Sequence, residues 1–565
     1  MLNHIIFVVY LIIFLLSNIG YGYLFGSIFD KDLKSLNYGY LGILGFFFII
    51  FISILSSFVS PHNYIHNSIL HLVGLFFFFT NFLIDKYKNI IELKRLSLIF
   101  LIFIPGIYLF KNHDDFGYYH LTYALNLSQN SFVIGTGALG HGFRTMSSLF
   151  YYNSTLYLPF IKFYLFHSGP FFILLYFNYA VLTKIYNKFK KKQIDIIYFF
   201  SLLNFIFVNV VFYRIAEHGT DRSGQILLFL IFIIFLDLFF LKNTKKQKNT
   251  IFNFLLVAIL LAVTTKVLFI IYSIIVIIIL LKNDYYKNYF IRKNLKIITV
   301  LIFGFLMNLL INFFSTGCLL YPEEKTCVAH EFEWSVPKEE VKLMKIHYEW
   351  WAKAGGGPGY SSKIKKEDYV KNFIWIDDWI DRHFFNKVSD TLLGIIFIAL
   401  LNIVLFKGKK KKKLKIKKIF LINLILLMFF LEWFLGHPSM RYGGYVLFAL
   451  PIFIFTSRKI ETYNIGEKKL YFTSAFLILL TLTIYNVRNI KRINFEVNNY
   501  NYPLLKSPFF NVENVEVNVM DQLDDFKIYK TVSGMCWAAP TPCTHRPSLK
   551  IKYWNNFKVI TRDDQ

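Results

Sequence analysis

The chain alternates between long apolar runs and short polar or basic segments from one end to the other. Most apolar runs are close to 20 residues long, the length that a helix needs to cross the hydrocarbon core of a bilayer. The expected spans are 4–22, 40–59, 68–84, 96–110, 169–186, 195–213, 225–241, 251–264, 267–282, 297–315, 391–406, 419–435, 442–456 and 470–486. The pattern therefore predicts an all-α polytopic membrane protein with about 14 (12–14) transmembrane helices.

The basic segments between these runs set the expected orientation. Clusters of Lys and Arg occur at 86–95, 188–192, 242–248, 292–296 and 407–418. Loops rich in these residues usually remain in the cytoplasm. The first apolar run is expected to be retained as a helix, because no basic residue precedes it and no small-residue cleavage site follows it.

Segment 251–282 decides the orientation of everything after it. Its 32 residues form either one long helix or a tight pair of short ones. Both flanks are basic, so both ends should be cytoplasmic, which requires a pair with Lys266 at its outer apex. The loops 111–168, 214–224, 316–390 and 436–441 and the tail 487–565 then face away from the cytoplasm.

Composition narrows the class of protein. The chain of 565 residues is 55% hydrophobic, which excludes a soluble hydrolase. A formal net charge of +27 could suggest nucleic-acid binding, but the lysines lie in short clusters between apolar runs. We expect no nucleic-acid partner, and multi-pass insertion in the inner (plasma) membrane.

All four cysteines lie in the regions expected outside. Cys318 and Cys327 form one close pair, and Cys536 and Cys543 form the other. Close pairs on the oxidising side predict two local disulfides. Zinc is disfavoured because neither pair has CxxC spacing. The tail also contains NFEVNN (494–499) and NVEVNV (514–519), which alternate as strands do, so we expect a small disulfide-stapled α/β or β domain there.

Polar side chains gather in the outward loops, at the ends of the expected helices, where ionisable groups are costly unless used. An outward carboxylate can deprotonate an acceptor hydroxyl, and Arg or Lys can stabilise a leaving phosphate. The candidate site residues are His113, Asp114, Asp115, Tyr118, Tyr119, His120, His141, Arg144, His218, Asp221, Arg222, Lys266, His437 and Arg441.

Each candidate also has a structural explanation. Asp115 could cap a helix that begins near Phe116, although one cap accounts for only one of the two adjacent acids. Asp221 could cap a turn at GTD (219–221), and the histidines could be interfacial hydrogen-bonding groups. Lys266 and Arg441 could extend toward lipid headgroups. The sequence leaves these alternatives open.

Five segments carry a family resemblance: HDDFGYYH (113–120), EHGTDRSGQ (217–225), GCLLYPEEKTC (317–327), PSMRYGGY (438–445) and CWAAPTPCT (536–544). Together they resemble an uncharacterised bacterial multi-pass family that is associated with the GT-C superfamily of polyprenyl-phosphate-sugar-dependent glycosyltransferases. The resemblance runs from about residue 95 onward. It departs from the GT-C pattern because four expected helices precede the acidic loop, which in GT-C enzymes usually follows the first helix.

The resemblance implies N-terminal transmembrane helices over 1–94, a GT-C-like transmembrane core over 95–486 and an extracytoplasmic domain over 487–565. It makes Asp114 or Asp115 the catalytic base, with a divalent metal (Mg or Mn) as an open question. Arg441, and less directly Arg222 or Lys266, would face the donor phosphate. The partners implied are membrane lipid, a lipid-linked sugar as donor and a glycan as acceptor.

Two other functions compete with a transferase. A transporter or flippase for a polyprenyl-linked oligosaccharide usually keeps its polar groups near mid-membrane. Here they collect at one face, which favours an enzyme. A non-catalytic scaffold would predict that the acids are dispensable. The sequence does not identify the sugar, the acceptor, the stereochemistry or the oligomeric state.

Overall fold

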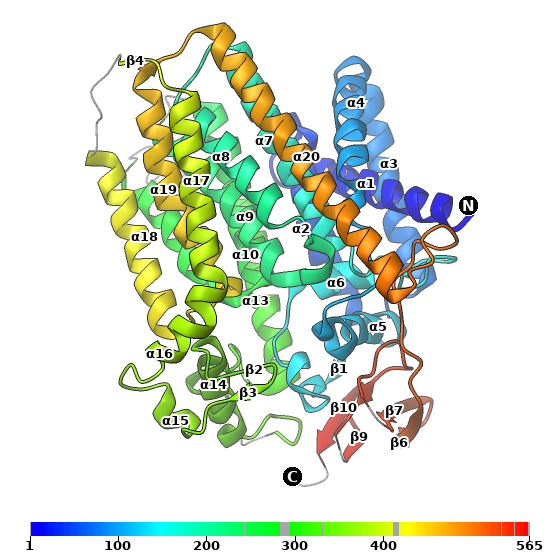
Figure 1. The fold of residues 1–565 in the computed structure, drawn as a ribbon. Helices are drawn as coiled ribbons and strands as arrows, with labels where there is room; N and C mark the ends of the chain where they lie inside the picture. The colour runs from blue at the N-terminus through cyan, green and yellow to red at the C-terminus, as the bar shows by residue number, and fades with distance from the viewer. Residues whose placement is uncertain are drawn as a thin grey trace.

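The computed structural model describes residues 2–240, 245–282, 294–328, 332–410, 417–532, 534–546 and 548–562, and helices dominate it (Figure 1). The helices of the N-terminal half are α1 (Leu2–Phe29), α2 (Tyr38–Ser57), α3 (Tyr64–Ile84), α4 (Lys86–Phe103), α5 (Leu121–Gln129), α6 (Ser148–Ser154), α7 (Gly169–Lys190), α8 (Ile196–Val211), α9 (Ile215–Phe240), α10 (Lys245–Thr265) and α11 (Ile274–Lys282). Those that follow are α13 (Leu295–Thr316), α14 (Lys338–Ala352), α15 (Lys366–Tyr369), α16 (Ile376–Trp379), α17 (Ser389–Leu405), α18 (Lys417–Gly436), α19 (Gly444–Glu461) and α20 (Glu467–Tyr500).

Several of these helices suit a membrane. Within the described ranges, nine are long and apolar enough to cross a bilayer, and Ile196–Val211 and Val267–Leu281 are shorter apolar helices. This supports a mostly helical multi-pass membrane protein. The total of about 14 spans stays a prediction.

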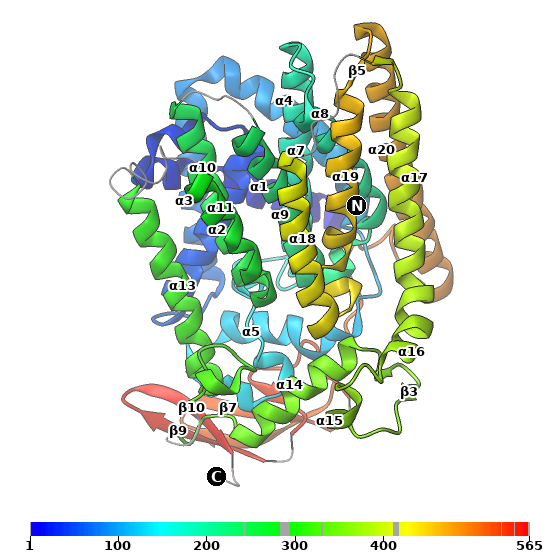
Figure 2. The same cartoon turned by 90° about the vertical axis from the view of Figure 1, so that its left-hand side faces the viewer.

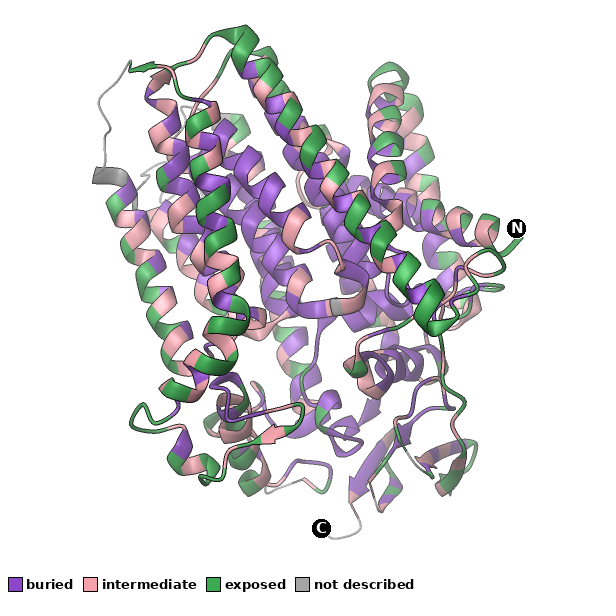
Figure 3. Cartoon of the chain, viewed as in Figure 1, coloured by how far each residue is buried: buried purple, intermediate pink, exposed green. Residues whose placement is uncertain are grey.

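The helices sort into a buried interior and an exposed periphery (Figure 3). In the α9 span, 89% of the residues are buried, against 28% in the span that ends with α17. Leu393, Phe397, Leu400 and Val404 recur on one face of α17 and are all exposed. Such a continuous apolar outer surface is costly in water and stable in lipid, which agrees with the membrane assignment.

The chain breaks at Lys266, as the sequence predicts. Helix α10 ends at Thr265, Lys266 is extended (φ −150°, ψ 111°), and a 3₁₀ turn over Val267–Ser273 leads into α11. The alternative of a single long helix over 251–282 is therefore excluded.

The segments expected outside gather at one end of the helices. Figures 1 and 2 show α5, α14, α15 and the C-terminal strands together at the bottom, whereas β4 (Lys409–Lys410) and β5 (Tyr463–Asn464) lie at the top. The other strands are β1 (Val133–Ile134), β2 (Gly356–Gly357), β3 (Tyr360–Ser361), β6 (Val517–Leu523), β7 (Phe526–Thr531), β8 (Cys543–Thr544), β9 (Leu549–Trp554) and β10 (Phe557–Arg562). Which end faces outward stays a prediction.

The tail contains strands, but not where the first alternating pattern lies. Residues 494–499 belong to α20, which continues to Tyr500, so the expectation of a strand there is wrong. Glu496 explains the difference, because its side chain faces inward and pairs with Arg492 one turn earlier at 2.9 Å. Residues 517–519 of the second pattern do begin β6.

The C-terminal strands are joined to the rest of the chain. Strand β10 pairs in parallel with β1 from the first large loop and antiparallel with β9. Strands β6, β7 and β8 form a second sheet. Both predicted disulfides, Cys318–Cys327 and Cys536–Cys543, are present.

A charge cluster centred on Glu340 ties three segments together. Its carboxylate accepts from Arg144 at 2.8 Å, Arg546 at 3.2 Å and Arg562 at 2.6 Å. Burial opposes ionisation of Glu340, but Arg562 and Arg144 outweigh it and lower the pKa from 4.5 to about 2. The cluster thereby joins α14, the first loop and the tail.

We expect Glu340→Gln to lower the melting temperature of the purified protein at neutral pH by a few degrees, because it leaves buried guanidinium groups without their counter-charge. The folded pKa lies below the unfolded one, so this stabilisation is complete above pH 4.5 and is lost as the pH falls toward 2. The gap between wild type and variant should close over that range. Glu339→Gln, at an exposed neighbour, is the control. Equal melting of Glu340→Gln and wild type at pH 7 would contradict this role.

Candidate functional site

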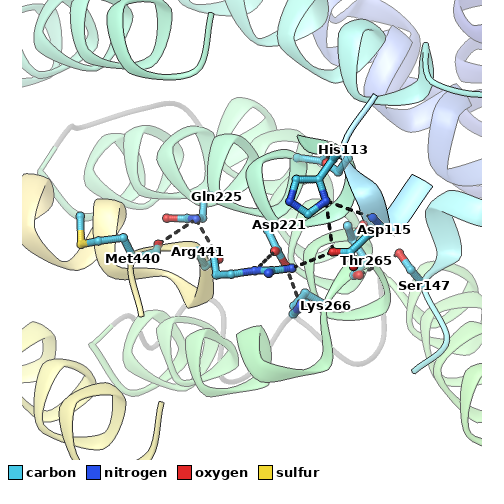
Figure 4. A network of polar contacts seen from close by, with 11 residues as sticks. His113, Asp115, Ser147, Asp221, Gln225, Thr265, Lys266, Met440 and Arg441 are labelled. Atoms are coloured by element: carbon cyan, nitrogen blue, oxygen red, sulfur yellow. Dashed lines mark hydrogen bonds and ion pairs between the residues drawn. The ribbon is translucent and has the colours of Figure 1, made fainter. Parts of the chain in front are cut away.

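Four charged side chains from distant segments meet in one polar cluster: Asp115, Asp221, Lys266 and Arg441 (Figure 4). Arg441 donates through Nε to Asp221 at 2.7 Å and contacts Asp115 through Nη2 at 3.4 Å. Lys266 donates to the other oxygen of Asp221 at 2.5 Å. Two acids and two cations thus form a continuous chain of contacts.

Asp115 is brought to the cluster by the end of α4 and a tight turn. Helix α4 ends at Phe103, because Pro105 prevents its continuation. The Asp115 side chain makes no capping hydrogen bond to the turn that follows, so the capping explanation is excluded. It contacts Arg441 instead, and also His113 at 3.5 Å.

The turn after Asp115 is π-helical. It covers Phe116–His120, and the amide of Leu121 donates to the carbonyl of Phe116. Single π turns are frequent at functional sites, because the extra residue rotates the side chains that precede it.

Asp221 is positioned by a break at Gly219. This glycine has φ +49° and ψ −123°, a left-handed conformation that interrupts α9. A side chain here would be strained, and it would also meet the ring of His120 at 3.2 Å. The carboxylate of Asp221 bonds Lys266 and Arg441 rather than capping a turn, and it is only 9% exposed.

Backbone contacts hold the two cations in place. Gln225, one turn beyond Asp221, donates to the carbonyls of Met440 at 3.3 Å and Arg441 at 3.1 Å. Ser147 donates to the carbonyl of Thr265 at 2.9 Å, next to Lys266. The loops that carry the cations are therefore fixed to the loops that carry the acids.

Electrostatics keep the cluster charged and its neighbour neutral. The charge of Asp221 raises the pKa of Arg441 well above its ordinary value. Burial lowers the pKa of His120 to about 4, although Asp115 and Asp221 oppose this shift. At neutral pH, His120 is therefore an uncharged imidazole beside two carboxylates.

The tail braces the acidic segment. The amide of Trp537 donates to the carbonyl of Gly117 at 3.0 Å, and its ring lies against Gly117 so closely that a Cβ there would be 2.5 Å away. Trp537 lies in the loop closed by Cys536–Cys543. This disulfide loop therefore supports the backbone two residues after Asp115.

Other expected site residues lie elsewhere. Asp114 is exposed and has no ion pair with any described residue. Arg144 is fully buried against Glu340, which favours a structural role. Tyr118 and His141 are hydrogen-bonded at 3.0 Å. Tyr118 also lines a small hollow with Tyr119 and His545.

The remaining candidates flank the cluster. Arg222 donates to the carbonyl of Arg214 at 3.3 Å, and its guanidinium lies 5.8 Å from the Phe212 ring. The ring of His437 lies 6.2 Å from that of Tyr442. The side chain of His218 lies outside the described residues.

A metal is not accommodated by the arrangement. Across the ranges that the structure describes, no three His, Cys, Asp or Glu side chains are grouped as ligands. Both carboxylates of the polar cluster are directed to Arg441. The residues present do not fit a divalent ion.

Sequence reasoning missed a basic cleft. It has a volume of about 470 Å³, and its cations are Lys111, Arg214, Arg488, Lys491 and Arg492. Two of these come from the segments that lead into Asp115 and Asp221, and three come from α20. The signal in the sequence is VRNIKR (487–492) directly after the last apolar run.

We expect Gly117→Ala to lower the free energy of unfolding by roughly 1–3 kcal/mol, because the added methyl group overpacks the Trp537 ring. Thermal unfolding followed by tryptophan fluorescence measures this. Gly357→Ala is the control, since a Cβ at that position meets nothing within 4 Å. If both variants melt like wild type, Trp537 does not brace the acidic segment.

Comparisons with known proteins identify one family. The model of a domain of unknown function, DUF8201, matches residues 1–448. No curated protein and no solved structure matches the chain. The matched region includes the four N-terminal helices and all four residues of the polar cluster, and it stops within α19, before the tail. The chain therefore belongs to the DUF8201 family.

Proposed function

We propose that this chain is an integral membrane glycosyltransferase that transfers a sugar from a polyprenyl-phosphate donor to a surface or lipid-linked glycan on the extracytoplasmic side. The observation that carries the proposal is the polar cluster, in which Asp115 is held by Arg441 at the ends of apolar helices. The resemblance of the motifs around these residues to the GT-C superfamily supplies the reaction class.

In the proposed reaction, the hydroxyl of the acceptor attacks the anomeric carbon of the donor sugar. A carbon–oxygen bond forms there, and the bond from the anomeric carbon to the phosphate oxygen breaks. The polyprenyl phosphate leaves with the electron pair, and the hydroxyl proton passes to the carboxylate of Asp115.

Asp115 suits the role of base better than Asp114. Its carboxylate is oriented by Arg441, whereas Asp114 is exposed and no ion pair fixes it among the described residues. A catalytic base must be held in reach of the proton that it removes. Asp221 is then a positioning residue, because it fixes Arg441 and Lys266 without facing open space.

Asp115→Asn should reduce transfer by roughly 10²- to 10⁴-fold, because the amide keeps the shape of the side chain and cannot accept the proton. Surface and lipid-linked glycans are compared in cells with a deletion, with the wild-type gene or with the variant, at equal protein levels. The variant should reproduce the truncated glycan of the deletion, and the missing sugar would name the substrate.

Asp114→Asn is the matched control and should leave the glycans unchanged. If Asp115→Asn also matches wild type while the deletion is defective, the transferase proposal fails, and transport or scaffolding becomes the better explanation. A defect confined to Asp114→Asn would instead reassign the base.

Arg441→Lys should also reduce transfer, although it keeps the positive charge. Arginine reaches Asp221 through Nε and Asp115 through Nη2, and a single ammonium group cannot reproduce both contacts. The glycans of cells with Arg441→Lys should resemble those of cells with Asp115→Asn, while the amount of membrane-inserted protein stays normal. Arg382→Lys, at an exposed position in the helical segment Ile380–Val388, is the control for the substitution. Normal glycans in Arg441→Lys would show that the bridge is dispensable.

A further inference from the structure

The basic cleft shares two chain segments with the polar cluster. Lys111 is four residues before Asp115, and Arg214 is seven residues before Asp221, so the same two segments line both features. The third wall is the last turns of α20, where Arg488, Lys491 and Arg492 recur at helical spacing.

Positive charge in the cleft is only partly compensated. Its five cations face two acids, Glu217 and Glu496. Glu217 forms an ion pair with Arg214, and Glu496 with Arg492 at 2.9 Å. The other three cations, Lys111, Arg488 and Lys491, have no ion pair with a described residue.

Two of the uncompensated cations are held in place by aromatic rings. The guanidinium of Arg488 stacks over the Tyr213 ring at 3.8 Å and donates to the carbonyl of Val210. The ammonium of Lys111 lies 5.0 Å from the Tyr500 ring. Such contacts fix the direction of each cation, so less conformational entropy is lost when an anion binds.

Arg492 has a different part in the cleft. Its Nη2 donates to the carbonyls of Pro105 at 3.3 Å and of Tyr108, and the carboxylate of Glu496 also accepts from the amide of Phe110 at 2.7 Å. The Arg492–Glu496 pair thus fixes the loop between α4 and Lys111. This ion pair therefore has a structural role in one wall of the cleft, and the other cations remain for ligand binding.

The cleft opens beside the apolar surface of α20. Phe476, Leu479, Val487 and Ile490 are exposed along this helix, and Lys491 lies one turn after Val487 on the same face. A molecule whose anionic group enters the cleft could therefore lay a hydrocarbon chain along α20. A free anion has no hydrocarbon chain and would make no contact with this apolar surface.

We propose that the basic cleft binds the phosphate group of a phosphate-bearing lipid through Lys111, Arg488 and Lys491. Fixed Arg and Lys side chains suit phosphate oxygens, which accept charge-assisted hydrogen bonds. The polar cluster is less suited to this task, because its two cations are already balanced by Asp115 and Asp221. The inference concerns binding alone and goes beyond the proposed transfer reaction.

The test is a binding titration of the full-length protein in maltoside micelles, which contain no phosphate, with farnesyl phosphate as the probe. The triple variant Lys111→Gln, Arg488→Gln, Lys491→Gln should lower the affinity roughly tenfold or more, because it removes several charge-assisted hydrogen bonds. Lys468→Gln, at the other end of α20, should bind like wild type. Equal affinity of wild type and the triple variant would overturn the proposal.

Further arms identify the ligand and control for folding. Farnesol and inorganic phosphate should each bind much more weakly than farnesyl phosphate, and equal binding of inorganic phosphate would overturn the lipid assignment. Lys491→Gln alone changes an exposed side chain and should still weaken binding if the triple variant misfolds. Asp115→Asn should bind the probe normally, so a failure of the transfer reaction is distinguishable from a failure of this site.

Discussion

The arrangement of the loops at the end of the molecule that carries the C-terminal strands depends on one guanidinium group. Arg441 contacts two carboxylates that lie 220 and 326 residues earlier in the chain, and each of those acids belongs to a different segment. Asp221 is almost fully enclosed, so without Arg441 and Lys266 its charge would be buried uncompensated, at a cost of several kcal/mol. These ion pairs compensate the buried charge. They therefore also determine how the segments after α4, α8, α10 and α18 are placed relative to one another.

That constraint also limits what the polar cluster can do chemically. The bridging arginine orients Asp115, but the two acids neutralise much of its positive charge. Asp221 likewise neutralises much of the charge of Lys266. A cluster that is close to neutral is a poor site for a phosphate that arrives with one or two negative charges. If the reaction involves a lipid phosphate, proton transfer and phosphate binding are best assigned to separate groups: Asp115 for the first, and cations outside the cluster for the second.

The sequence predicted the members of the polar cluster better than their contacts. Charged residues at the ends of apolar runs identify Asp115, Asp221, Lys266 and Arg441, because such positions are costly, and the basic flanks predict the break at Lys266. Which acid meets which cation depends on long-range packing, so the sequence could not separate Asp115 from Asp114 or show that Arg144 is enclosed by Glu340. The strand expected at 494–499 failed for a similar reason, since an alternating pattern does not reveal that Glu496 pairs along a helix.

The cations of α20 are the remaining departure from a simple membrane pattern. Lys and Arg usually gather on the cytoplasmic side, and the basic clusters at 188–192, 242–248 and 407–418 are predicted to be cytoplasmic for that reason. Arg488, Lys491 and Arg492 lie at the opposite end of α20 from the loops predicted to be cytoplasmic, where the orientation bias provides no reason for them. Of these three, only Arg492 has a carboxylate partner within the part of the chain that the structure describes, and its contacts hold the loop before Lys111. Arg488 contacts the Tyr213 ring and the Val210 carbonyl, but neither it nor Lys491 has a carboxylate partner among the described residues, and this missing counter-charge is the reason to propose an anionic ligand.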